Sequence, residues 1–196
     1  MDREYILNNY YFEKLDDEHD LSNFNCDSAD LNDFLKNDAF RQQEENLSIT
    51  QLVICNGEII GFFSLLADII KISHIRDKKT IELIKDKKPR AKQLPAVKIG
   101  RFAISDKYTN QGIGSHIFRN VFYSIKLLSE NIGLRFITVE GYAKAYNFYV
   151  KHNCFNSLEK DDKKLNQLEK IIKTNPEHIF YLYRDIKTLY PTHVDD

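Results

Sequence analysis

The feature that most constrains this chain is a strand, a glycine-containing loop and a long helix in immediate succession. Residues 97–104 are mostly apolar, several of them β-branched, and predict a strand, and the polar residues 105–110 follow as a loop. Gly112 and Gly114 lie where this loop turns into a helix. The helix is indicated by apolar residues at helical spacing, namely Ile113, Ile117, Phe118, Val121, Phe122, Ile125 and Leu128. Any fold for the chain must accommodate this strand–loop–helix unit.

Strands and helices are mixed along the rest of the chain. The spacing of apolar residues predicts a helix over 28–43, and Asn56-Gly57 predicts a hairpin between strands at 49–55 and 58–70. The second half predicts a strand at 134–139, a helix at 143–151 and a last strand at 178–186. We therefore expect an α+β (mixed α/β) fold in a single domain over 1–196, with a charged insertion at about 71–93, containing a short helix around 80–85, and a helical insertion at about 160–174.

Composition excludes several classes of protein. No apolar run approaches the roughly 20 residues that span a bilayer, and residues 1–20 contain no signal peptide, so no membrane partner is expected. Cys26, Cys55 and Cys154 are odd in number and far apart, which favours a reducing cytoplasm and argues against a cysteine-based zinc site. We expect a cytoplasmic protein that binds no metal.

The glycine loop is suited to binding an anion. The amides of the loop and the positive end of the helix can converge on a phosphate group, and glycine lets that group approach the backbone. The loop lacks the Lys-Ser/Thr pair of the P-loop that binds nucleoside triphosphates, and it lacks the third glycine of the dinucleotide-binding fingerprint. Neither of these two kinds of nucleotide site is therefore expected. Taken alone, the two glycines are better explained by a tight turn into a helix than by a phosphate site.

Residues 98–105 (KIGRFAIS) and 108–115 (YTNQGIGS) resemble the central strand and phosphate loop of the GNAT N-acetyltransferase superfamily. The resemblance implies a central, mostly antiparallel sheet with a splayed central strand pair, flanked by helices, and acetyl-CoA as co-substrate. It also implies that the pantetheine arm binds along Phe102, Ala103 and Ile104, and that the pyrophosphate binds the amides of Gln111, Gly112, Ile113, Gly114 and Ser115. The family pattern opens with Gln or Arg three residues before the first glycine, where this chain has Thr109.

A catalytic acid is implied by the same resemblance. Residues 139–149 (VEGYAKAYNFY) are similar to the family's next strand and to the helix that ends in Phe-Tyr, whose tyrosine is the acid in relatives. A phenol with an ordinary pKa of about 10 is protonated at neutral pH and can donate a proton to the departing thiolate of coenzyme A. We assign this role to Tyr149 and interpret Tyr142 and Tyr146 as aromatic residues that pack in the core.

The first 65 residues narrow the resemblance to the toxins of bacterial toxin–antitoxin pairs. The similar segments are residues 24–27 (FNCD), 31–35 (LNDFL) and 61–65 (GFFSL). These toxins acetylate the α-amino group of aminoacyl-tRNA and are commonly dimers held by an antitoxin. The resemblance therefore implies aminoacyl-tRNA as acceptor, an antitoxin as protein partner and a homodimer.

The residues themselves leave the acceptor open. The strand at 97–104 carries Lys98 and Arg101 but no carboxylate to act as base, which favours an α-amine with a pKa of about 7.7–8.0 over a lysine at about 10.4. Residues 71–92 hold nine Lys or Arg against three acids and suit an RNA, whereas residues 1–50 hold thirteen acids against four Lys or Arg. Glu140 lies at the end of a strand near the expected site and could act as a base through water, although an exposed carboxylate that adds solubility is the interpretation we favour. Acetylation of a small-molecule amine or a protein N-terminus, and a non-catalytic acyl-CoA-binding regulatory module, remain alternatives.

Overall fold

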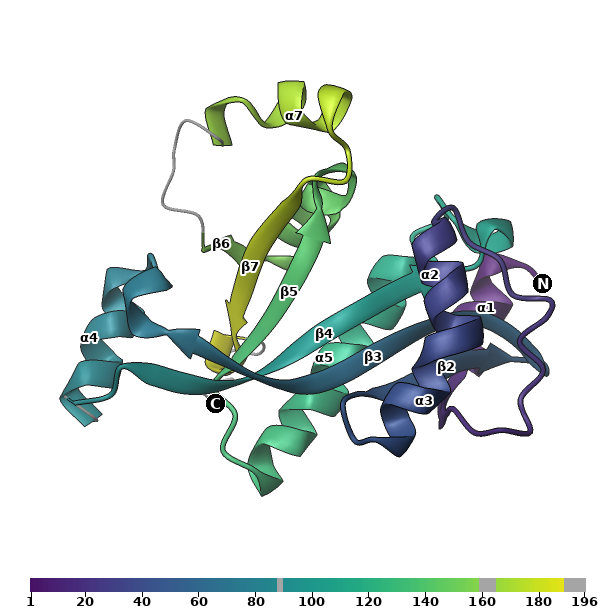
Figure 1. The fold of residues 1–196 in the computed structure, drawn as a ribbon, viewed down its shortest axis with the longest axis horizontal. Helices are drawn as coiled ribbons and strands as arrows, with labels where there is room; N and C mark the ends of the chain where they lie inside the picture. Colours follow the sequence, from purple (N-terminus) through teal and green to yellow (C-terminus); the bar gives the residue numbers. More distant parts are fainter. Residues whose placement is uncertain (88–89, 159–164, 189–196) are drawn as a thin grey trace, which may run out of the picture. The chain divides into compact units, whose positions relative to one another are not determined.

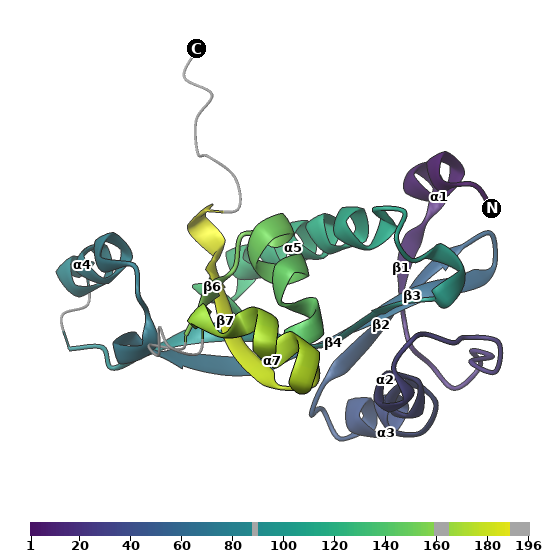
Figure 2. The same cartoon turned by 90° about the horizontal axis from the view of Figure 1, so that it is seen from above.

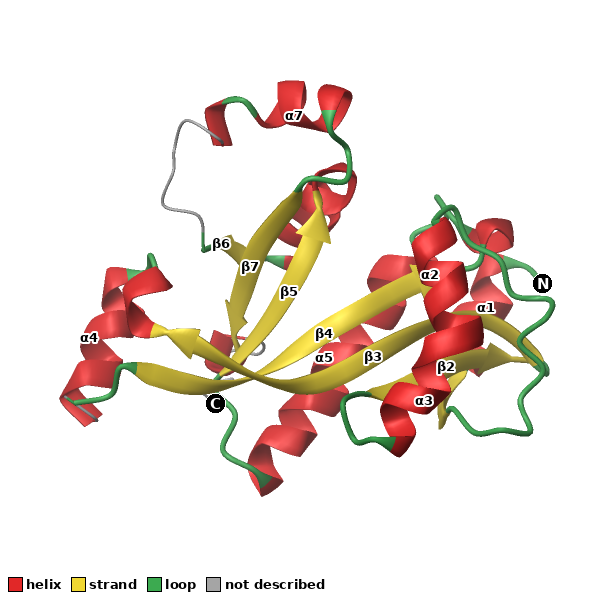
Figure 3. Ribbon diagram, in the orientation of Figure 1, coloured by secondary structure: helices red, strands yellow, loops and turns green. Residues whose placement is uncertain are grey.

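The computed structural model of the protein describes residues 1–87, 90–158 and 165–188, in which seven strands form one sheet in the order β1-β2-β3-β4-β5-β7-β6 (Figure 1). The strands are β1 (Tyr11–Lys14), β2 (Ile49–Cys55), β3 (Glu58–Lys71), β4 (Gln93–Ile104), β5 (Phe136–Tyr142), β6 (Asn156–Ser157) and β7 (Ile179–Asp185). The α-helices are α1 (Arg3–Asn9), α2 (Ala29–Asp33), α3 (Ala39–Glu44), α4 (Lys78–Lys87), α5 (Ile113–Asn131) and α7 (Leu168–Thr174) (Figure 3). The mixed α/β class predicted from the sequence is confirmed.

The chain divides into two compact units, Met1–Leu66 with Ile99–Val121 and Ala67–Lys98 with Phe122–Asp196. None of the helices in the three described ranges has both the length and the apolar character that a membrane-spanning helix requires.

The hairpin between β2 and β3 in the first unit forms where the sequence predicts it. Asn56 and Gly57 both have positive φ, at 50° and 74°, which is the backbone of a two-residue turn whose twist matches that of the strands. The antiparallel register runs from Cys55 opposite Glu58 to Ile49 opposite Leu65. A bulge interrupts the register between Val53 and Ile54.

The helix predicted over 28–43 is present with a π-helical segment in its middle. Ser28 caps its first turn by accepting a hydrogen bond from the amide of Leu31, and the segment Phe34–Asp38 joins α2 to α3. The side chains of this helix that face the sheet are buried against Leu52 and Phe62. They are Phe34, Leu35 and Ala39. Burying each of the two larger side chains contributes about 1.5–3 kcal/mol, which fixes the helix on the sheet.

The long helix α5 begins at Ile113, and its apolar stripe is buried as the sequence predicts. The buried side chains are Ile113, Ile117, Phe118, Val121, Phe122 and Ile125. Figure 2 shows α2 and α3 on one face of β2 and β3, and α1 with the first turns of α5 on the other. The first unit is therefore a sheet covered by helices on both faces.

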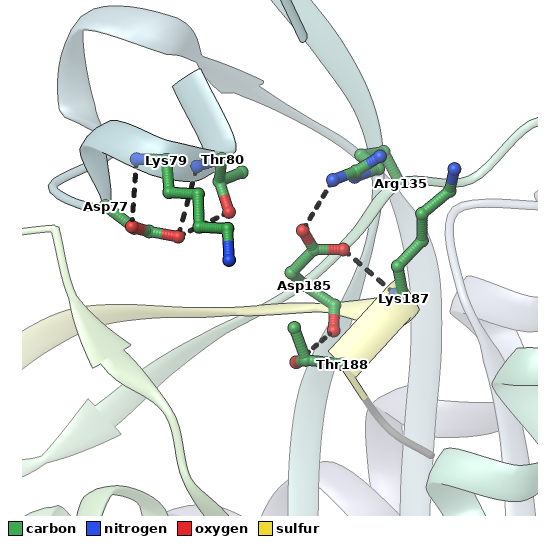
Figure 4. A network of polar contacts seen from close by, with 7 residues as sticks. All are labelled: Asp77, Lys79, Thr80, Arg135, Asp185, Lys187 and Thr188. Atoms are coloured by element: carbon green, nitrogen blue, oxygen red, sulfur yellow. Dashed lines mark hydrogen bonds and ion pairs between the residues drawn. The ribbon is translucent and has the colours of Figure 1, made fainter. Parts of the chain in front are cut away.

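The second unit contains the antiparallel pair β5 and β7, with Phe136 opposite Asp185 and Tyr142 opposite Ile179. Arg135 and Asp185 form an ion pair at 2.6 Å, and the Asp185 carboxylate also accepts from the amide of Lys187 (Figure 4). Asp77 caps the start of α4 by accepting from the amides of Lys79 and Thr80, both at 3.2 Å. The first contacts link the residue before β5 to the end of β7, and the second cap the first turn of α4.

The predicted charged insertion 71–93 corresponds to the stretch between β3 and β4 that holds α4. Its apolar residues Ile75 and Ile84 are buried in the same hydrophobic core as Phe136 and Tyr183. The predicted helical insertion 160–174 is described only from 165 onward, where α7 forms its second half. The single domain over 1–196 stays a prediction.

Some elements were not expected from the sequence. The short helix α1, the four-residue β1 and the two-residue β6 carry too little periodicity to be recognised locally. The helix predicted over 143–151 is present as a continuous helical stretch, which begins as a 3-10 turn at Ala143–Ala145 and ends with a π-helical turn at Phe148–His152.

Candidate active site

The loop between β4 and α5 has the geometry of an anion-binding helix start. Asn110 and Gly112 have positive φ, at 59° and 74°, and the amide of His116 donates to the carbonyl of Gly112 at 3.2 Å. Gly112 is therefore the residue before the first helical turn, and the next three amides have no partner within the helix. Those three amides belong to Ile113, Gly114 and Ser115. The positive end of a 19-residue helix thus coincides with the segment expected to hold the pyrophosphate.

A partly buried pair of hydrogen bonds holds this loop to the β2–β3 hairpin. The Tyr108 hydroxyl donates to Oε2 of Glu58 at 2.8 Å, and Lys107 Nζ donates to Oε1 of the same carboxylate at 2.7 Å. The hydrogen bond from Lys107 lowers the pKa of Glu58, and burial, followed by the bond to Glu58, raises the pKa of Tyr108 to about 12. Sequence reasoning missed Glu58, because no local pattern shows that this carboxylate meets a residue fifty positions later.

The strand residues expected along the pantetheine arm alternate between the two faces of the sheet. The ring of Phe102 lies edge-on to Phe118 of α5, with ring centroids 4.8 Å apart, whereas Ala103 is buried in the core beneath α2 and α3. The backbone of strand β3 lies very close to Ala103, as shown by Gly61: a Cβ there would lie only 2.7 Å from the Ala103 carbonyl oxygen. Ile104 ends the strand with a half-buried side chain. The first unit thus brings residues 102–104 and 111–115 into one strand–loop–helix, and their contacts with acetyl-CoA stay predictions.

Tyr149 belongs to the second unit and lies in the π-helical turn Phe148–His152. Its ring contacts the rings of Phe148 and Phe155 edge-on, at centroid distances of 5.2 and 5.8 Å. Burial raises the pKa of Tyr149 to about 12, so its phenol is protonated throughout the physiological range. The phenol therefore keeps its proton and can donate a hydrogen bond, and its role as the catalytic acid stays a prediction.

Gly141 of β5 makes room for that phenol. A Cβ at Gly141 would lie 2.8 Å from Cε2 and 2.9 Å from Cδ2 of Tyr149, closer than carbon atoms approach each other. The tyrosine ring therefore rests directly on the backbone of the strand. Sequence reasoning missed this glycine, although a glycine inside a strand is the expected sign of a close approach. Tyr146 packs on Phe180 at 4.9 Å, which agrees with its interpretation as a core aromatic residue.

The candidate base Glu140 is engaged in an ion pair. Its Oε1 lies 2.6 Å from Nζ of Lys98, and Thr138 on the same strand donates to Oδ2 of Asp68 at 2.5 Å. These four residues line a cavity of about 230 Å³ in the second unit together with His74 and Tyr181. The Glu140 carboxylate is therefore held in an ion pair with the Lys98 ammonium group.

No family model matches the chain. A curated relative, the tRNA-acetylating toxin of Mycobacterium tuberculosis, is 23% identical over 177 residues, which cover 90% of this chain and 93% of that toxin. The solved structure of AtaT complexed with acetyl-methionyl-tRNAfMet has a TM-score of 0.73 at 22% identity and covers 92% of this chain and 97% of its own.

A second solved structure is a tyrosine-to-phenylalanine variant of the AtaT toxin bound to the C-terminus of the antitoxin AtaR and to acetyl-CoA. It has a TM-score of 0.66 at 22% identity and covers 92% of this chain and 96% of its own. Over almost its whole length the chain therefore resembles these toxins and has their fold, which confirms the fold class expected from the sequence.

Proposed function

We propose that this protein is an acetyl-CoA-dependent N-acetyltransferase of the toxin type, which transfers an acetyl group to the α-amine of an aminoacyl-tRNA. The observation that carries this proposal is the resemblance to a tRNA-acetylating toxin across 90% of the chain. A solved relative holds acetyl-methionyl-tRNAfMet, the product of such a reaction.

Acetyl-CoA is supported as the donor by the loop before α5. Its positive-φ glycine and its three amides without a partner inside the helix suit a diphosphate, and an AtaT variant of the same fold binds acetyl-CoA. The tight turn into a helix, which alone would explain the glycines, does not account for this resemblance. The amides of residues 111–115 are therefore proposed to bind the pyrophosphate, and the main chain of residues 102–104 the pantetheine arm.

The proposed chemistry is a direct transfer. The neutral amine attacks the thioester carbonyl, the carbon–sulfur bond breaks, the acetyl group stays on nitrogen, and the proton lost by the amine balances the one gained by the thiol. Tyr149 donates a hydrogen bond to the departing sulfur. Because the phenol pKa is about 12 and that of a thiol about 8.5, complete proton transfer from Tyr149 is uphill. The phenol therefore stabilises the developing thiolate by hydrogen bonding. Any proton that it donates to the sulfur is replaced by the proton that the amine loses.

An α-amine fits the charges around the strand. Strand β4 offers no carboxylate to deprotonate a lysine. The guanidinium of Arg101, on the same strand, lies 5.1 Å from the centre of the Phe34 ring, and its Nε lies 3.9 Å from the carboxylate of Asp30. An amine with a pKa of about 7.7–8.0 is substantially neutral at physiological pH without a base. The basic residues of α4 and its flanks supply charge that suits a polyanion.

The proposed partners follow from the same relatives. An AtaT variant is bound to the C-terminus of an antitoxin, so we propose that this chain binds an antitoxin and forms the homodimer implied by the resemblance. A protein that acts on tRNA with acetyl-CoA would work in the cytoplasm.

The test is incubation with acetyl-labelled acetyl-CoA and either charged or uncharged tRNA. We expect label in charged tRNA only, and its release as N-acetyl amino acid when the ester bond is hydrolysed by mild base. Label in small amines or in peptide N-termini, but not in tRNA, would favour housekeeping acetylation. Binding of acetyl-CoA without release of coenzyme A to any acceptor would favour a regulatory module.

The role of Tyr149 is tested in the same assay with Tyr149→Phe. Loss of the donor should lower kcat about 100-fold, within the range for acid catalysis, and leave the Kd for acetyl-CoA unchanged. Tyr123→Phe is the matched control, because Tyr123 is 52% exposed on α5. Unchanged kcat in Tyr149→Phe would refute the assignment.

A further inference from the structure

A guanidinium group from the start of the chain lies at the phosphate loop. Arg3 is the first residue of α1, and its Nε donates to the carbonyl oxygen of Gln111 at 2.8 Å, across 108 positions of sequence. A Cβ on Gly112 would lie 3.9 Å from Nη2 of the same side chain. We propose that Arg3 binds the pyrophosphate of the acyl-CoA donor, an inference that rests on the proposed use of this loop for that donor.

The position of Arg3 is set by contacts at both ends of α1. The carboxylate of Asp2 accepts from the amide of Tyr5 at 2.8 Å and caps the first turn, and Ile6 is fully buried. Immediately after the helix, the Tyr10 hydroxyl accepts from Asn120 of α5. The Tyr10 ring also lies edge-on to His116, with centroids 5.8 Å apart. Helix α1 is thus fixed against the first two turns of α5, which begin at the loop.

The guanidinium retains the donors that a phosphate needs. Its Nε is used by Gln111, which leaves the Nη1 and Nη2 edge to form two parallel hydrogen bonds. In the described part of the chain, the Arg3 side chain makes no ion pair with a carboxylate that would compete.

The electrostatic surroundings also favour an anion. Burial is the main cause that lowers the pKa of His116, and the positive charges of Arg119 and Arg3, which act on the same first turn of α5, lower it further. Thr109 stands where the family that the loop resembles has Gln or Arg. Its hydroxyl donates to the Asp106 carbonyl at 3.1 Å, within the loop itself. Arg3 therefore supplies from α1 the polar donor that the loop sequence lacks.

The test compares the acetyl-CoA affinity of the wild type with that of Arg3→Ala and Arg3→Gln by titration calorimetry. A hydrogen bond to a charged group corresponds to about a tenfold to hundredfold change in Kd, and we expect a loss in this range at low salt. The loss should shrink as salt is raised, because exposed charges are screened. Arg3→Lys should fall between, since ammonium cannot form the paired contact.

Two controls make the result specific. Arg41→Ala removes the same charge from an exposed position on α3 and should leave the Kd unchanged. Thermal unfolding of each Arg3 variant should match the wild type, because alanine and glutamine are good helix formers. A variant that lost affinity only in proportion to a loss of folded protein would overturn the proposal.

The phosphate is identified by repeating the titration with acetyl-dephospho-CoA, which lacks the 3′-phosphate. An equal loss of affinity for both donors in Arg3→Ala supports contact with the pyrophosphate, whereas a loss confined to acetyl-CoA would overturn that assignment. Equal Kd values for wild type and Arg3→Ala would overturn the role of Arg3 alone. Absence of acetyl-CoA binding by the wild type would overturn both this role and the proposed donor.

Discussion

Replacing Gly141 with alanine should disable Tyr149 without touching it. The new Cβ would lie 2.8 Å from Cε2 of the ring, and ordinary carbon contacts begin near 3.4 Å, so the ring must retreat by about 0.6 Å. The rings of Phe148 and Phe155 limit the directions in which it can move. Since misplacement by about 1 Å can cost a factor of about 100 in rate, kcat should fall about tenfold to hundredfold.

The donor site should be spared by this change, because the phosphate loop belongs to the other compact unit. We expect the Kd for acetyl-CoA to remain within about twofold, and the free energy of unfolding to fall by the roughly 1–3 kcal/mol typical of an overpacked site. Urea denaturation gives that value, and thermal unfolding gives the temperature below which the variant is fully folded for kinetics. Gly133→Ala is the matched control, because a Cβ there meets nothing within 4 Å.

A double-mutant cycle with Tyr149→Phe decides whether the loss of rate acts through the phenol. Phenylalanine keeps the ring atoms that meet the new Cβ but removes the hydroxyl group. If Gly141→Ala acts by displacing that hydroxyl, it should have little further effect on kcat in the Tyr149→Phe background. The reasoning would be refuted by an undiminished kcat in Gly141→Ala, or by an equal loss in both backgrounds.

Two further changes test the phosphate loop. Gly112→Ala places a side chain at φ 74°, which should lower the free energy of unfolding by about 1–2 kcal/mol in urea denaturation and weaken acetyl-CoA binding; unchanged values of both would contradict the assigned backbone role. The pKa of Glu58 is lowered in the folded state, so its contribution to stability is present above the ordinary carboxyl pKa and lost as pH falls through the folded value. Glu58→Gln should therefore destabilise the protein at pH 7 more than at pH 3.5, and an equal effect at both pH values would show that the carboxylate charge is irrelevant.

Features that depend on neighbouring residues could be predicted from the sequence. Asn56 and Gly57 tolerate positive φ, which is sufficient to specify the hairpin, and the periodicity of α5 is sufficient to specify its buried face. The loop and its glycines were placed correctly for the same reason. Strand β5 was predicted at 134–139 but extends to Tyr142, because pairing with β7 sets its bounds.

Features that depend on distant partners could not be predicted. Helix α1 has seven residues, too few to be stable alone, and forms because Ile6 and Tyr10 contact the rest of the first unit. Its Arg3 therefore reaches the loop through packing that no local pattern encodes. The same holds for Gly141, whose significance appears only when the ring of Tyr149 is seen against it.

The central claim, that the acceptor is the α-amine of an aminoacyl-tRNA, is tested most directly by mass spectrometry. Charged tRNA is treated with the protein and acetyl-CoA and digested to its 3′-terminal aminoacyl-adenosine. The account predicts that this fragment gains the mass of one acetyl group on its amino-acid part with the wild type and almost none with Tyr149→Phe. An unmodified fragment, under conditions in which the protein releases coenzyme A with another amine, would contradict it.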